Sequence, residues 1–200
     1  MSQISNYKDL HAGKNLFILA SGTSLASHDL SLLKNKMVMG LNRSILIYPA
    51  PYYQCVFDHR LFDLFHDALK KTRQLFTLED RPFGQSIKLL GGDGFSWDME
   101  EGIYSGYTIS YFALQLAVYM GFKKIFFLGL DLKHDGHNTH FFGQDPQTIN
   151  HEETEFPRMI KMLQHGAHVL ADTDIKVYNC SPVSTLEAFP KISFGDAAAL

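Results

Sequence analysis

The sequence has 200 residues, of which 46% are hydrophobic and 20% are charged. These values are typical of one ordinary globular domain and exclude a disordered chain. The formal net charge is −3 and there is no long basic run, so no nucleic-acid partner is expected. No apolar run reaches the roughly 18 residues that span a bilayer, and the first residues lack the apolar core of a signal peptide. We therefore expect a cytoplasmic protein.

Short apolar runs alternate with helical patterns along the whole chain. Strands are predicted at residues 15–20, 37–42, 52–57, 74–78, 124–129 and 175–180. Helices are predicted at 29–34, 61–70, 106–120 and 152–168, the last interrupted near Pro157. Ser105 is expected to cap the helix at 106–120 and Gly121 to end it. This alternation predicts an α/β fold, a single Rossmann-like domain whose mostly parallel sheet has helices on both faces.

Two features of the composition bear on the boundaries and the redox state of this domain. Cys55 and Cys180 lie in apolar, strand-like surroundings and are expected to be buried thiols without a disulfide. Residues 196–200 resemble a cloning scar, so the single α/β domain is predicted to comprise residues 1–195.

Small or polar residues follow the predicted strands. They are Ser21, Gly22, Thr23, Asn42, Asp58, His59 and Asp131. Ligands of open α/β sheets bind at the carboxyl ends of the strands, so these residues predict a pocket. The turn at 21–24 could cradle a phosphate, although such turns also carry glycine for steric reasons alone. It is neither a Walker motif nor a full GxGxxG fingerprint.

Further candidates for anion binding lie outside these strand ends. Ser105 and Gly106 precede the best-defined helix, where a phosphate would meet free N–H groups, or where Ser105 is simply a cap. Asp131 could hold a sugar hydroxyl or a metal, or bond its own turn. Four cations could neutralise a phosphate: Arg43, Arg60, Lys133 and Arg158.

Several histidines follow the strand at 124–129. His134, His137 and His140 have the spacing H-x-x-H-x-x-H, and His151 lies further along. Zinc is conceivable there, but Gly136 argues against a helix that presents three ligands, and we expect no metal. A neutral histidine is the natural general base near pH 7, while at least two of the four are expected to be surface residues.

Four segments carry a resemblance to known families. They are ASGTSL at 20–25, LNRS at 41–44, the block from Tyr104 to Asp131, and CSPVSTLEAFP at 180–190. They are similar to the bacterial sialyltransferases of glycosyltransferase family 42. They are at least as similar to a related family that includes motility-associated glycosylation factors and an archaeal hydroxymethylpterin pyrophosphokinase. The resemblance covers most of residues 15–194.

The resemblance implies a Rossmann-like sheet with a CMP-sugar donor site. The residues that it would place around the nucleotide and the donor are Ser21, Gly22, Thr23, Asn42, Ser105, Gly106 and Asp131. His59 stands where the family has an asparagine that contacts the donor. His151 matches the histidine base, and His140 is its rival. Lys133 and Thr139 lie where the sialyltransferases use two tyrosines to hold the phosphate, which weakens the expectation of sialic acid specificity.

These features together predict a bacterial glycosyltransferase of surface polysaccharide biosynthesis. It would transfer an acidic keto-sugar (sialic acid, another nonulosonic acid or a Kdo-like sugar) from CMP to a glycan or lipid-linked acceptor. Transfer would invert the anomeric centre, with a histidine base and no cofactor. One alternative is a pyrophosphokinase that binds ATP and Mg²⁺ through carboxylates such as Asp58 and Asp131. The other is a non-catalytic nucleotide-binding module. Peripheral membrane contact and homo-oligomerisation remain open.

Overall fold

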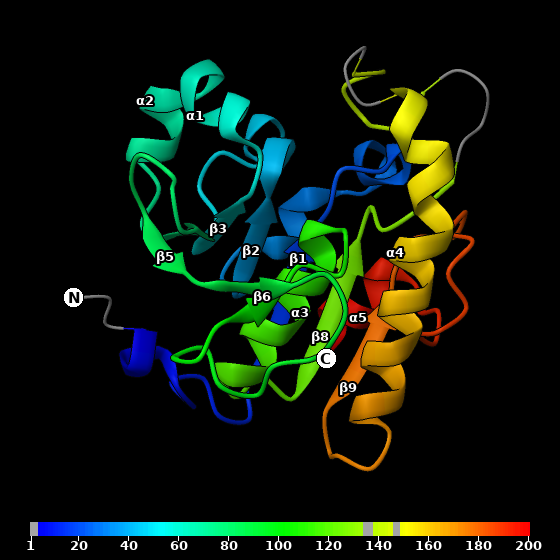
Figure 1. Ribbon diagram of the computed structural model, residues 1–200. Helices are drawn as coiled ribbons and strands as arrows, with labels where there is room; N and C mark the ends of the chain where they lie inside the picture. The colour runs from blue at the N-terminus through cyan, green and yellow to red at the C-terminus, as the bar shows by residue number, and fades with distance from the viewer. Residues whose placement is uncertain (1–3, 134–137, 146–148) are drawn as a thin grey trace.

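A seven-stranded sheet forms the centre of the computed structural model, which describes residues 4–133, 138–145 and 149–200. Its strand order is β5-β4-β3-β2-β1-β8-β9, and each neighbouring pair is parallel (Figure 1). The strands are β1 Asn15–Leu19, β2 Val38–Leu41, β3 Tyr53–Val56, β4 Leu75–Leu78, β5 Gln85–Ile87, β8 Lys124–Leu128 and β9 Lys176–Asn179. A separate two-stranded ribbon pairs β6 Leu89–Gly91 with β7 Ile103–Tyr104. The predicted α/β fold class is confirmed, whereas β5 was not expected.

Helices cover both faces of the sheet. They are α1 His59–Leu64, α2 His66–Lys70, α3 Ile109–Tyr119, α4 Ile149–Leu170, α5 Phe194–Ala199 and the 3-10 helices η1 Ile4–Tyr7, η2 Thr23–Ser27, η3 Leu30–Leu33 and η4 Asn42–Leu46. Leu16 and Ile18 of β1 belong to the core that contains α3, whereas Phe17 and Leu19 belong to the core that contains η3 and α5. Alternate side chains of one strand are therefore buried on opposite faces, which explains its uninterrupted apolar run.

The helix expected at 106–120 begins three residues later than predicted. Its N-cap is Thr108, whose side chain accepts a hydrogen bond from the N–H of Ser110 at 3.3 Å. The expectation that Ser105 is the cap is wrong, because the N–H of Ser105 extends the β6–β7 pairing by donating to the Gly91 carbonyl. The predicted stop is confirmed, since Gly121 follows the C-cap with φ +84°.

Two other helical expectations also needed correction. The segment 61–70 forms two short helices, α1 and α2, separated at Phe65. Helix α4 is continuous through Pro157 rather than interrupted there. A proline removes one backbone hydrogen bond, but Met162 and Leu163 of α4 are buried in the same core as α3, and this packing supports the helix.

The last residues of the chain are included in the fold. Helix α5 covers one face of the sheet, and its Ala197 is fully buried. The segment that we set apart as 196–200 thus contributes to the core. Cys55 and Cys180 are free and buried, as predicted. None of the helices within the described residues is long and apolar enough to cross a membrane.

Candidate functional site

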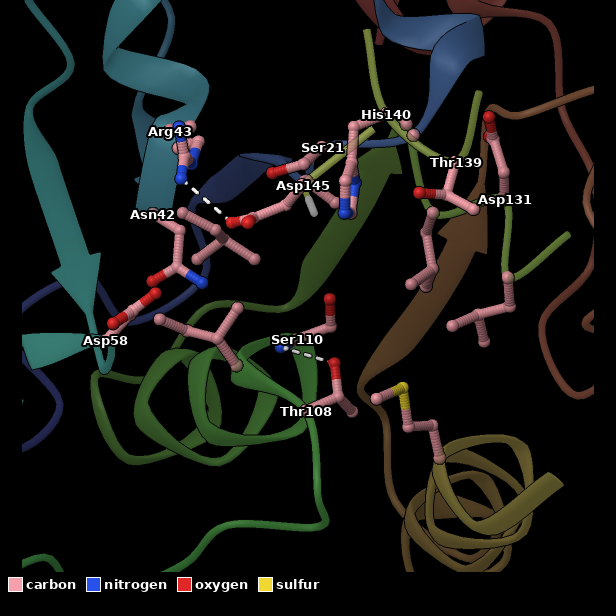
Figure 2. A pocket seen from close by; sticks show the side chains of 18 of the residues that line it. Ser21, Asn42, Arg43, Asp58, Thr108, Ser110, Asp131, Thr139, His140 and Asp145 are labelled. Carbon is pink, nitrogen blue, oxygen red and sulfur yellow. Dashed lines mark hydrogen bonds and ion pairs between the residues drawn. The ribbon is translucent and has the colours of Figure 1, made fainter. Parts of the chain in front are cut away.

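A cavity of about 370 Å³ opens at the carboxyl ends of β1, β2, β3 and β8 (Figure 2). Strand β1 pairs with β2 on one side and with β8 on the other, so the order of the strands reverses here. Open α/β sheets bind ligands at such a switch point. The structure thus brings together the loop after β1, the end of β2 and the segment after β8, as predicted. The sequence-predicted residues that line the cavity are Ser21, Gly22, Asn42, Arg43, Asp58, Arg60, Asp131 and His140.

Other predicted residues do not line this cavity. The hydroxyl of Thr23 donates a hydrogen bond to Oδ2 of Asp131 at 3.3 Å. The N–H of Gly106 donates a hydrogen bond to the Gly92 carbonyl, which places Gly106 beside the β6–β7 ribbon. Ser105 likewise donates its N–H to the ribbon and does not line the cavity. His59 and Lys133 are exposed and also lie outside it.

The histidine motif can be located only in part. His134 and His137 lie outside the described residues, and so does the side chain of His151, whose backbone is in the first turn of α4. Within the described part of the chain, no three histidine, cysteine or carboxylate side chains are grouped as a metal site would require.

Asp131 anchors the loop that follows β1. The residue is 3% exposed, and its carboxylate accepts hydrogen bonds from the backbone N–H of Ser24 at 2.9 Å and from the Ser24 hydroxyl at 2.5 Å. Hydrogen bonds to a carboxylate are stronger than those between neutral groups. Asp131 therefore joins the end of β8 to the start of η2, although it also lines the cavity.

Gly22 is required by the close approach of the same two segments. Its N–H donates to the Gly129 carbonyl at 2.8 Å. A Cβ atom on Gly22 would lie 2.5 Å from Cγ of Asp131 and 2.5 Å from the Gly129 oxygen. Its φ of −63° suits any residue. The constraint on Gly22 is thus the space between the loop and β8.

Backbone strain is concentrated at the cavity. Asn42, Tyr107 and Leu132 have positive φ angles of 46°, 59° and 47°, and all three line it. Such angles are uncommon outside glycine and gather at functional sites. Asn42 is held by its side-chain oxygen, which accepts a hydrogen bond from the N–H of Phe57 at 3.2 Å. It thereby links the ends of β2 and β3.

A cluster of two arginines and two carboxylates lies beside Asn42. Asp145 accepts from Nη2 of Arg43 at 2.9 Å and from Nη2 of Arg60 at 3.2 Å. Arg60 also pairs with Asp58 at 2.5 Å, and this hydrogen bond raises the pKa of the Arg60 guanidinium above its ordinary value. Sequence reasoning considered both arginines as cations but missed Asp145, because nothing in its local pattern marks it.

The amino end of α3 faces the cavity as well. Thr108, Ile109 and Ser110 line it, so the positive end of the helix dipole lies at the cavity. Thr139 also lines it and is 4% exposed, and its hydroxyl has no hydrogen-bond partner within the described residues. The residues of this helix start that line the cavity are thus 108–110, and the predicted residues 105 and 106 do not line it.

Two solved structures share this architecture. The sialyltransferase CstII from Campylobacter jejuni in complex with cytidine-5'-monophosphate is 16% identical. It superposes with a TM-score of 0.56, covering 91% of this chain and 86% of that chain. The chain has a sialyltransferase-like fold. The complex of CstII with CMP-3FNeuAc gives 14% identity and a TM-score of 0.53, covering 90% and 85%. No protein-family model and no curated protein sequence matches the chain.

Among the residues that the structure describes, His140 is the histidine that lines the cavity of this sialyltransferase-like fold. Its ring stacks on Phe142, with centroids 4.7 Å apart and planes 16° from parallel. The cavity thus combines the side chain of Ser21, the amino end of α3, a pair of arginines and an imidazole. These groups can bind an anion and accept a proton from a hydroxyl group.

Proposed function

We propose that this chain is a glycosyltransferase that transfers an acidic keto-sugar from CMP to a glycan or lipid-linked acceptor. The observation that carries the proposal is the cavity at the strand-order reversal of a sialyltransferase-like fold. The similar protein CstII is described in complex with cytidine-5'-monophosphate and with CMP-3FNeuAc. The cavity's volume of about 370 Å³ is within the usual range for small-ligand sites.

In the proposed reaction, the acceptor hydroxyl attacks the anomeric carbon from the face opposite to CMP. The bond to the phosphate oxygen breaks with its electron pair, and CMP leaves as an anion. The side chain of Ser21 and the amino end of α3 would hold that anion, because N–H groups at a helix start stabilise negative charge. A histidine would accept the acceptor's proton, leaving an inverted anomeric centre.

The magnesium-dependent alternative is less well supported by the geometry. It needs carboxylates such as Asp58 and Asp131 free to hold the ion. Asp58 forms an ion pair with Arg60, and Asp131 is occupied by Ser24. Thermal-shift measurements separate the alternatives. Stabilisation by CMP without Mg²⁺ supports the transferase, whereas stabilisation only by ATP with Mg²⁺ supports the kinase. No response to any nucleotide would contradict both.

The direct test is hydrolysis and transfer across a panel of CMP-sugars. We expect release of CMP from donors whose sugar carries a carboxylate. Failure to release CMP from every donor, with and without candidate acceptors, would contradict the proposal.

The base is tested by replacing one histidine at a time. We expect His140→Ala or His151→Ala to lower kcat by roughly 100- to 10,000-fold while CMP binding stays nearly intact. His168→Ala, at an exposed position near the end of α4, is the matched control and should retain full activity. Undiminished turnover in both test variants would remove the histidine base from the mechanism.

A further inference from the structure

The arginine–carboxylate cluster at the cavity has the geometry of an occupied anion site. Arg43 lies in η4, which follows β2, and Arg60 lies on α1, which follows β3, so two different strand ends bring their guanidinium groups together. Asp145 reaches between them from the segment after β8, and Figure 2 shows its carboxylate directed at Arg43. Its side chain is only 9% exposed. Both cations thus meet one carboxylate that belongs to the chain itself.

The contacts match those of a bound two-oxygen anion. One oxygen of Asp145 lies 2.9 Å from Arg43 and 3.2 Å from Arg60, and the other lies 3.4 Å from Nη1 of Arg60. Guanidinium groups bind carboxylates and phosphates in this forked manner. Arg43 also lies over the ring of Phe142, 4.8 Å from its centroid, which helps to orient it.

We propose that Arg43 and Arg60 bind an anionic group of the donor, and that Asp145 occupies their site until the donor displaces it. This inference rests on the proposed function, because an acidic sugar linked to CMP offers two such groups, a phosphate and a carboxylate. Removing one partner of a buried ion pair leaves an uncompensated charge, so exchange of one anion for another is the favourable route. Asp145 acts as an internal competitor that lowers the apparent affinity for weak anions.

The central test is Asp145→Asn, which keeps the shape of the side chain and removes its charge. Apparent affinity falls in proportion to the fraction of protein whose site is accessible. If Asp145 occupies the site about nine-tenths of the time, the variant should bind CMP-3FNeuAc about tenfold more tightly in calorimetric titration. An unchanged or raised Kd would overturn the proposal. Asp172→Asn, which is exposed in the turn after α4, controls for the change in net charge.

Arg43→Gln identifies which anion the site takes. Loss of affinity for CMP-3FNeuAc alone assigns the site to the sugar carboxylate, and equal loss for CMP and CMP-3FNeuAc assigns it to the phosphate. Unchanged affinity for both overturns the proposal, even if the Asp145 variant does not fold. Arg73→Gln is the matched control, because Arg73 is exposed and lies over Tyr52, outside the cavity.

Inorganic phosphate separates this inference from the function on which it rests. If the wild-type protein binds neither CMP compound, the proposed function fails. Phosphate should still raise the Tm of Asp145→Asn more than that of the wild type, because the variant lacks the competing carboxylate. Equal shifts in the two proteins, together with unchanged nucleotide affinity, would overturn the inference.

Discussion

Replacing Asp131 should weaken the attachment of the loop after β1 to the end of β8. The carboxylate accepts from the N–H and the hydroxyl of Ser24, and from the hydroxyl of Thr23. A hydrogen bond to a charged group contributes about 1.5–3 kcal/mol, against about 0.5–1.5 kcal/mol between neutral groups. In Asp131→Asn the two bonds to Ser24 can persist as neutral bonds, so the expected loss is about 2 kcal/mol. Asp131→Ala leaves the Ser24 N–H without its acceptor and should cost about 4 kcal/mol.

These losses are large enough to measure by urea unfolding, followed by far-UV circular dichroism. An unchanged m-value with a lower midpoint indicates a change in stability alone. For a protein of this size, about 2 kcal/mol corresponds to a fall in Tm of about 4–8 °C. Asp172→Asn, at an exposed position, should stay within about 0.5 kcal/mol of the wild type. A similarly small effect of Asp131→Asn, or equal losses for Asn and Ala, would refute the anchoring role.

Three further predictions use stability alone. Gly22→Ala should cost about 1–3 kcal/mol in urea unfolding, because its Cβ would lie 2.5 Å from Asp131 and Gly129. In Gly195→Ala the nearest atom is 3.9 Å away, so an equal loss there would contradict the argument. Thr108→Ala should cost about 1 kcal/mol as a lost helix cap, and Ser105→Ala clearly less; the reverse order would restore Ser105 as the cap. Burial lowers the pKa of His11 from 6.5. The contribution of neutral His11 to the free energy of unfolding is therefore complete above pH 6.5 and is lost as the pH falls toward the folded-state pKa. The Tm should therefore fall less steeply between pH 7 and pH 5 in His11→Phe than in the wild type, and identical slopes would count against this assignment.

Part of the candidate site follows from the sequence through topology. An alternating chain of apolar strands and helices has one dominant solution, a parallel sheet with right-handed crossovers. All carboxyl ends of such a sheet lie at one edge, so residues directly after adjacent strands are neighbours whatever their separation along the chain. Ser21, Asn42 and Asp131 could be assigned to one pocket for that reason. Residues on helices and long loops, such as His59 and Lys133, have no such constraint, and the structure places them outside it.

The sequence by itself determined six of the seven strands of the sheet, their parallel arrangement and the edge at which the cavity lies, because local periodicity reports which faces of an element are apolar. Only the tertiary structure decided which distant side chains and segments contact one another. Asp145 lies 102 residues from Arg43, and no local pattern connects them. Pairing of the β6–β7 ribbon draws Ser105 away from α3 and leaves Thr108 as the cap. Docking of α5 on the sheet buries Ala197, although its composition suggested a segment outside the fold. Each of these contacts depends on packing between distant segments, which the spacing of residues along the chain does not encode.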